Sequence, residues 1–342
     1  LRALDWVDAE IDFSAIGHYL RWGYIPCPLT VYRGCEKLAP AHWMKIDASA
    51  IEARRYFSPN ALMQNREEPG SERTRALVVD AVRRQLVSDV PLGCFLSGGI
   101  DSSIIAAAMK ASVPSDQDVL TFSIGFDDPR YDETASAAQV AAHLGTKHRQ
   151  FIVRPDAAND LPRLAEVFGE PFADSSALPT HYLSRETRQH VKVALSGDGG
   201  DEAFGGYRRY AFHHAEEAIR RRIPRGIRRS LLAPLAALYP HGSWLPRPLR
   251  AKTTLAELSL DAADAYAGMV AALTQDSRNQ LLTPDFRKSL LGYRSEDVVR
   301  DHFNADLTLD AVQRAQYADV MTYLPGDILV KVDRASMANS LE

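Results

Sequence analysis

Apolar residues in the middle of the chain alternate between short continuous runs and longer stretches with helical spacing. Four short runs predict buried strands, at residues 90–97, 119–126, 148–153 and 191–196. Helical stretches lie between and before them, at residues 71–88, 101–112, 132–145, 160–169 and 178–189. Ser71 is placed to cap the first of these helices. Strands that alternate with helices of this length predict an α/β fold, a parallel sheet flanked by helices.

The two ends of the chain have a different pattern. Residues 1–57 form short pieces interrupted by proline and aromatic residues, with a helix expected at 14–21 and a strand at 42–47. This segment is too small to bury a core of its own, so we interpret it as the end of a larger domain that was cut. Residues 58–342 are expected to form the second domain, which begins with a polar connector and is mainly helical from 251 to the C-terminus.

Composition excludes several classes of protein. A length of 342 residues with 46% hydrophobic and 25% charged residues is ordinary for a globular protein of one or two domains. The net charge of -4 gives no general attraction to nucleic acid or to anionic membranes. The sequence shows neither a run of about 18 apolar residues nor a signal peptide, so no membrane span is expected. Three cysteines without metal-ligand spacing indicate the reducing cytoplasm, and Cys94 is expected to be a buried apolar residue.

Eight arginines fall between Arg208 and Arg229. They could form a basic patch for a polyanion, or a solvated helix face that leads into the apolar segment after them. We favour the solvated face, since the net charge of the chain is acidic.

The first chemical motif is the loop at residues 96–103, LSGGIDSS, between a predicted strand and a predicted helix. Two glycines let the backbone approach an anion closely, and the following helix N-terminus offers unpaired N–H groups. The GxxxxGK signature of the common nucleotide loop is absent. Asp101 would repel phosphates unless Mg²⁺ joined them. The alternative is a plain turn in which Asp101 or Ser102 caps the helix; we favour the phosphate cradle.

The second motif is the loop at residues 196–207, SGDGGDEAFGGY, after the last predicted strand. Glu202 stands where a dinucleotide-binding fingerprint requires glycine. Asp198, Asp201 and Glu202 place three acids within five residues, which suits Mg²⁺ ligands or a base beside a reacting centre. The alternative is a surface turn in which Asp201 caps the next helix.

These motifs resemble known families. The first loop is similar to the pyrophosphatase loop of the ATP-pyrophosphatase superfamily, whose fold is of the adenine nucleotide alpha hydrolase type. The second loop resembles a signature of the class B, glutamine-hydrolysing asparagine synthetases. Three more segments resemble that family, at residues 19–44, 131–148 and 324–342. The resemblance covers nearly the whole chain. It implies that residues 1–57 are the tail of a class II (Ntn-type) glutaminase domain and that residues 58–342 are a synthetase domain truncated at its C-terminus.

The resemblance also implies roles for single residues. Adenosine would be contacted by Leu96, Ile124, Ser196 and Gly197. Pyrophosphate would be held by Ser97, Gly98, Gly99, Asp101, Ser102 and Ser103. Asp101 and Asp201 would act through Mg²⁺. The catalytic group would be Asp198, at a position where some relatives carry glutamate, with Lys331 and Arg334 neutralising phosphate charge. For these two basic residues the alternative is a surface position at a helix end.

The implied reaction is the ATP-dependent conversion of aspartate to asparagine through β-aspartyl-AMP, with ammonia derived from glutamine in the full-length protein. Residue 1 is leucine and all three cysteines are internal, so the chain is expected to lack the glutaminase nucleophile and to be poorly active alone. A homodimer is possible; nucleic acid and membrane are not expected as partners.

Three alternative functions are compatible with parts of the sequence. One is amidation of another carboxylate in a polysaccharide or secondary-metabolite pathway, with residues 174–176 near the acceptor pocket or simply capping a helix. The second is a nucleotide-binding scaffold without turnover, which the two intact loops disfavour. The third is nucleic-acid binding through the arginines.

Overall fold

The computed structural model describes residues 10–59, 70–128, 132–239, 252–290 and 292–342. Contacts divide the chain into two compact units. The sheet unit consists of residues 66–201 and 327–342, and the helical unit of residues 1–65 and 202–326. Each unit is therefore built from segments that lie far apart in the sequence. Among the described residues, no helix is long and apolar enough to cross a membrane.

The sheet unit contains one four-stranded sheet in the order β5-β4-β3-β6. Its strands are β3 (Leu92–Phe95), β4 (Leu120–Phe126), β5 (Lys147–Val153) and β6 (Val193–Leu195). All three strand pairs are parallel, and Cys94 in β3 lies opposite Thr121 in β4 and Leu195 in β6. The predicted parallel α/β sheet is confirmed. Because the strands are parallel, the loops that follow them leave from the same edge.

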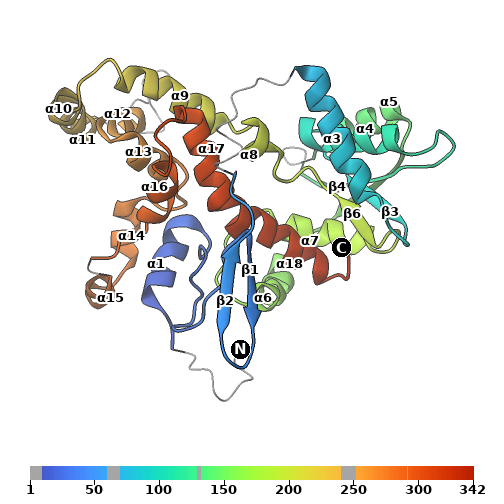
Figure 1. Cartoon of the computed structure of the whole chain (residues 1–342), viewed down its shortest axis with the longest axis horizontal. Helices are drawn as coiled ribbons and strands as arrows, with labels where there is room; N and C mark the ends of the chain where they lie inside the picture. The colour runs from blue at the N-terminus through green and yellow to red at the C-terminus, as the bar shows by residue number, and fades with distance from the viewer. Residues whose placement is uncertain (1–9, 60–69, 129–131, 240–251, 291) are drawn as a thin grey trace. The chain divides into compact units, whose positions relative to one another are not determined.

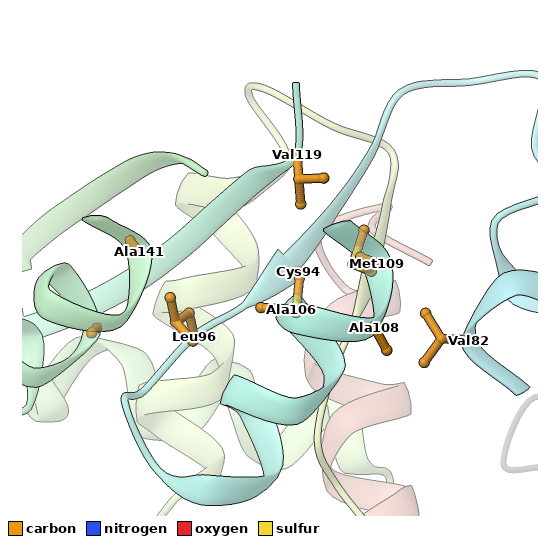
Figure 2. Packing of buried hydrophobic residues seen from close by; sticks show 9 residues of the cluster. Val82, Cys94, Leu96, Ala106, Ala108, Met109, Val119 and Ala141 are labelled. Atoms are coloured by element: carbon orange, nitrogen blue, oxygen red, sulfur yellow. The ribbon is translucent and has the colours of Figure 1, made fainter. Parts of the chain in front are cut away.

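One face of this sheet is covered by α3 (Ser71–Gln85), α4 (Ile100–Ser112) and α5 (Thr134–Leu144). Figure 2 shows part of the core between them, in which Val82 of α3 lies beside α4, and Ala106 of α4 lies beside Cys94 of β3. Cys94 has no exposed surface, and burial raises the pKa of its thiol to about 12. The expectation of a buried, apolar Cys94 is confirmed.

The other face carries α6 (Ala157–Phe168), α7 (Ala177–Thr187) and α18 (Leu329–Met337), which Figure 1 shows together in the sheet unit. Leu183 of α7 packs against Phe122 and Phe151 of the sheet. The C-terminal residue reaches the edge strand, since Glu342 accepts a hydrogen bond from Ala194 N at 2.8 Å. The three segments 70–128, 132–201 and 327–342 thus share one core.

Two predictions about helix starts were wrong, and one strand was not predicted. Ser71 is the first residue of α3, and the N-cap is Gly70, which has no side chain to bond with. Helix α6 begins three residues earlier than expected, because Asp156 accepts a hydrogen bond from Asn159 N at 3.4 Å and caps the helix there. The strand expected at 42–47 is β1 (His42–Ile46), and it pairs with an unpredicted strand, β2 (Ile51–Arg55). Strand β2 is exposed on both faces, so it lacks the apolar alternation that marks a strand.

The helical unit contains α1 (Phe13–Trp22), the β1–β2 hairpin and a long helical segment. The helices of that segment are α9 (Arg208–Arg220), α10 (Arg225–Ile227), η1 (Arg228–Leu232), α11 (Ala233–Leu238), α12 (Lys252–Ser259), α13 (Ala262–Met269), α14 (Gln275–Leu281), α15 (Pro284–Ser289), α16 (Asp297–Phe303) and α17 (Ala311–Met321). Helix α8 (Gly200–Phe204) and the π-helical turn η3 (Leu324–Ile328) lie at the changes between units. The predicted helical C-terminal part is confirmed.

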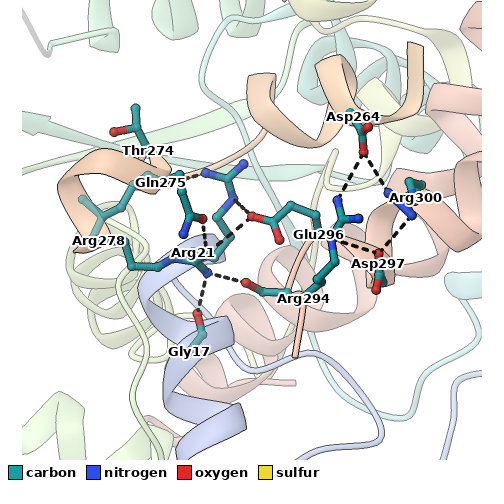
Figure 3. Close-up of polar contacts among 12 residues, drawn as sticks. Gly17, Arg21, Asp264, Thr274, Gln275, Arg278, Arg294, Glu296, Asp297 and Arg300 are labelled. Carbon is teal, nitrogen blue, oxygen red and sulfur yellow. Dashed lines mark hydrogen bonds and ion pairs between the residues drawn. The ribbon is translucent and has the colours of Figure 1, made fainter. Parts of the chain in front are cut away.

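A buried ion cluster joins α1 to the later helices of this unit, as Figure 3 shows. Arg21 on α1 and Arg278 on α14 each lie 3.5 Å from the Glu296 carboxylate. Arg21 also donates to Leu273 O at 2.8 Å. The segment 13–22 is therefore fixed to residues 273–296, although its assignment to a glutaminase-type domain stays a prediction.

A second buried cluster surrounds Asp319 on α17, which is 1% exposed. One carboxylate oxygen accepts hydrogen bonds from Arg209 at 2.7 Å, from Tyr210 at 2.6 Å and from Tyr266 at 2.6 Å. Burial and the Asp319 charge raise the pKa of both tyrosines above its ordinary value. Both hydroxyls therefore remain protonated donors.

The expected solvated arginine face is wrong for three of the eight arginines. Arg209 bonds Asp319, Arg220 lies 2.7 Å from Glu216, and Arg228 donates to Leu258 O at 2.7 Å. Carboxylates and carbonyl oxygens of the same unit thus satisfy these guanidinium groups.

Candidate active site

The two predicted loops meet at the carboxyl edge of the sheet. They follow β3 and β6, which are neighbouring parallel strands. A Cβ atom added to Gly197 would lie 2.8 Å from Ser102 N, and one added to Gly200 would lie 2.7 Å from the Asp101 Cγ. Any side chain at these two positions would collide with the start of α4. The glycines therefore let the backbone of the second loop lie directly against the first.

Hydrogen bonds within the first loop fix its shape. Ser97 Oγ accepts from Gly99 N at 3.2 Å, and Ser102 Oγ accepts from Ser97 N at 3.2 Å. Ser103 Oγ donates to Gly99 O at 2.6 Å. The N-cap of α4 is Gly99 and no side chain caps this helix, so the alternative in which Asp101 or Ser102 is the cap is wrong. The first turn of α4 keeps N–H groups that could bind an anion.

Gly98 joins this loop to α5. Its φ of +84° is in the left-handed region, and an added Cβ would lie 2.7 Å from Ala137 N and from the Ser136 Cβ. Just before α5, Asp132 accepts hydrogen bonds from Thr134 N at 3.0 Å and from Thr134 Oγ1 at 2.6 Å. These hydrogen bonds lower the pKa of Asp132. The sequence analysis did not predict this contact between Gly98 and α5, because in the sequence only the glycine itself indicates it.

The residues expected to contact adenosine follow the strands in the same region. Leu96 is 1% exposed and donates its N–H to Phe122 O at 2.8 Å, so it continues the sheet. Ile124 lies in β4, and Ser196 and Gly197 come directly after β6. The structure thus places Leu96, Ser196 and Gly197 directly after strands of one sheet, and Ile124 inside β4, two residues before its end.

Three of the expected acids, Asp101, Asp198 and Asp201, lie on the two loops, whereas Glu202 is 1% exposed and accepts a hydrogen bond from the Tyr207 hydroxyl at 2.8 Å. Asp101 is in the first turn of α4 and contacts Gly200, which directly precedes Asp201 in α8. Asp198 is exposed in the second loop. Within the described part of the chain, no group of three or more His, Cys, Asp or Glu side chains could hold a metal ion. Mg²⁺ is usually bound by one or two carboxylates with phosphate oxygens as further ligands, and Asp101 with Asp201 fits that donor set.

The two expected basic residues lie on α18 and differ in exposure. Arg334 is exposed, whereas Lys331 is only 7% exposed, so the alternative of a surface charge does not hold for Lys331. The Lys331 ammonium lies 3.1 Å from Asp174 Oδ2 and donates to Ser176 Oγ at 2.9 Å.

The capping interpretation is wrong for Asp174, because the N-cap of α7 is Ser176 and no side-chain hydrogen bond caps this helix. Asp174 accepts from both Ser176 N and Ser176 Oγ at 2.7 Å, just before α7. Burial alone would raise the pKa of Asp174, but Lys331 and the Ser176 hydrogen bonds outweigh it and lower this pKa. The carboxylate therefore remains charged opposite Lys331.

Replacing Gly197 with alanine is expected to weaken ATP binding by about tenfold, because the new methyl group forces the second loop away from Ser102. Calorimetric titration with ATP measures this effect. Gly268→Ala is the matched control, since no atom lies within 4 Å of its added Cβ. Equal affinities of the two variants for ATP would contradict the predicted contact.

Comparison with known proteins places these loops in a family. The family model described as asparagine synthase matches residues 73–342, which include both loops and α18. Asparagine synthetase [glutamine-hydrolyzing] 1 of Bacillus subtilis (strain 168) is 35% identical over 338 residues, 98% of this chain and 51% of that protein. Asparagine synthetase [glutamine-hydrolyzing] 3 of the same organism is 29% identical over 225 residues, 59% of this chain and 35% of its own length.

Asparagine synthetase B [glutamine-hydrolyzing] of Escherichia coli (strain K12) is 35% identical over 181 residues, 48% of this chain and 31% of that protein. The chain spans about half the length of the B. subtilis relative that it matches almost throughout. The family match, the parallel sheet and the two joined loops agree, and the chain belongs to the asparagine synthase family.

Proposed function

We propose that this chain carries the ATP-dependent amidation of aspartate to asparagine. The observation that supports this most strongly is the contact between the two loops, in which Gly197 and Gly200 lie against Ser102 and Asp101. That contact brings the start of α4, whose N–H groups would bind an anion, next to the loop that carries Asp198 and Asp201. The names of the relatives supply the proposed substrate and product.

The proposed reaction has two steps. An oxygen of the aspartate side-chain carboxylate attacks the α-phosphorus of ATP, and pyrophosphate leaves with the electrons of the α–β bridging bond. Ammonia then attacks the acyl carbon, loses a proton, and AMP leaves with the original carboxylate oxygen. The adenylate is needed because a phosphate ester leaves far more readily than an oxide ion.

The residues of the two loops would have different roles in this reaction. The backbone N–H groups of the first loop and of α4 would bind the leaving pyrophosphate, aided by Ser97, Ser102 and Ser103. Leu96, Ile124, Ser196 and Gly197 would hold the adenosine. Asp198 is exposed and negatively charged, so it can orient ammonia and accept its proton. Arg334 would neutralise phosphate charge from α18.

Asp101 and Asp201 would hold Mg²⁺, which neutralises phosphate charge when bound. In a protein of the relatives' full length, the nitrogen would come from glutamine by way of ammonia, as the names of the relatives suggest. Cys27, Cys35 and Cys94 are all free thiols, which supports a reducing compartment such as the cytoplasm. A homodimer stays a prediction.

The test follows AMP and pyrophosphate release from Mg·ATP with aspartate and ammonia. Asp101→Asn should lower the rate by about tenfold to a hundredfold, because one metal-binding charge at the phosphates is lost. Asp116→Asn is the matched control, since Asp116 is an exposed acid of the same unit.

Each outcome of that assay decides between candidates. Release that needs aspartate and falls only in Asp101→Asn supports asparagine formation. Release with another carboxylate alone would keep the chemistry and reassign the acceptor. Absence of AMP with every carboxylate, despite ATP binding, would contradict an enzymatic function.

A further inference from the structure

A buried cluster of two carboxyl groups and one ammonium group lies beside α18 in the sheet unit. Its members are Asp174, Ser176, Asp327 and Lys331. Lys331 contacts Asp174 and Ser176 at 3.1 Å and 2.9 Å. The side chains of Lys331 and Asp174 are 9% and 13% exposed. These charges are therefore shielded from water and interact strongly with one another.

Lys331 forms its ion pair with Asp174, so the carboxyl group of Asp327 has no cation of its own in the cluster. Asp327 is 7% exposed, and its Oδ1 atom has no hydrogen-bond partner among the described residues. Its carboxyl group is hydrogen-bonded to that of Asp174, which requires a proton between the two. With both carboxyl groups ionised, the cluster would carry one buried negative charge in excess of Lys331. A buried unpaired charge is costly, so the pair retains one proton.

The titration of this proton falls in the neutral range. Burial raises the pKa of Asp327 to about 7, and the neighbouring Asp174 charge adds to the effect while Lys331 opposes it. Helices α6 and α7 also pack on α18. These helices carry Asp160, Arg163, Glu166, Arg185 and Glu186, of which Asp160, Arg163 and Arg185 act on His181, while the charges that act most on Asp327 are those of Asp174 and Lys331. The charge of the cluster is therefore governed by Asp174 and Lys331.

We propose that Asp327 is a positioning residue that, by sharing a proton with Asp174, keeps the Lys331 ammonium at Ser176 and sets the net charge that α18 presents to ATP. This rests on the proposed function, in which α18 faces the phosphates. With the proton present, the cluster is neutral and Lys331 is bound by one carboxylate. Once the proton is lost, Lys331 is shared between two carboxylates, and the added negative charge opposes phosphate binding.

The test compares ATP affinity across pH in wild type, Asp327→Asn and a control. Asparagine has the shape of the protonated carboxyl and cannot ionise. In wild type, ATP binding should weaken by about threefold to tenfold from pH 6 to pH 8.5 relative to Asp327→Asn. Glu257→Gln is the control, because Glu257 is also a carboxyl group whose pKa is raised, to about 8, but lies in the helical unit. Its pH profile should match wild type.

A second readout separates this proposal from the proposed function. Carbon NMR of labelled aspartate carboxyl groups should show a titration near pH 7 that disappears in Asp327→Asn. If this titration is observed, disappears in Asp327→Asn and coincides with the change in ATP affinity, the positioning role stands. That conclusion holds even when no carboxylate supports AMP release. An unchanged pH profile of ATP binding in Asp327→Asn, or the absence of that titration in wild type, would overturn the inference.

Discussion

Gly98→Ala should abolish measurable AMP and pyrophosphate formation and destabilise the sheet unit by about 2–5 kcal/mol. Two costs add. A left-handed φ of +84° costs an L-residue about 1–2 kcal/mol, and the new Cβ would lie 2.7 Å from the backbone nitrogen of Ala137. A backbone atom in a helix cannot move aside to relieve this collision, whereas the tip of a flexible side chain could. The loop must therefore shift, and the N–H groups of α4 lose their alignment.

Gly145→Ala is the control that has the backbone strain of a positive φ without the steric collision. Gly145 also has a left-handed φ, of +65°, but no atom lies within 4 Å of its added Cβ. This variant should lose only about 1–2 kcal/mol and retain its rate of AMP release. Thermal melting and hydrogen exchange of the α4 amides give the stabilities. Equal losses of activity in the two variants would contradict the role assigned to the contact between Gly98 and α5.

Asp319→Ala is the substitution with the largest expected effect on stability alone. It removes the acceptor of four hydrogen bonds, two of them from Arg209, and leaves that guanidinium without its carboxylate in a site where Asp319 is 1% exposed. Removing one partner of a buried ion pair costs about 3–5 kcal/mol. The free energy of unfolding should fall by that amount. All four tryptophans fall in the residue ranges of the helical unit, so tryptophan fluorescence in urea reports on this unit.

Asp264→Ala is the matched control in the same unit. Asp264 also pairs with arginine, at 3.2 Å from Arg300, but its side chain is 29% exposed. Partly solvated pairs contribute about 0–1 kcal/mol, so this loss should be small. A loss for Asp319→Ala no greater than that for Asp264→Ala would show that the buried cluster is not a main source of stability.

The sheet and its helices could be predicted from the sequence because their signals are local. The stretch 119–126, for example, is rich in β-branched and aromatic residues, and both faces of this parallel strand are largely buried. Strand β2 gave no such signal, because it is exposed on both faces and is specified by its partner β1. The cap of α6 was missed for a related reason, since Asp156 lies outside the apolar pattern that marked the helix.

The sequence by itself determined the kind of chemistry, because the glycines, serines and acids of the two loops are consecutive and their order carries the family resemblance. Only the tertiary structure decided which residues meet. It brought Gly200 against Asp101, and it placed Lys331 with Asp174 across 157 positions of the chain rather than at the surface. Local patterns report the burial of one segment, whereas the partner of a buried charge depends on how distant segments pack.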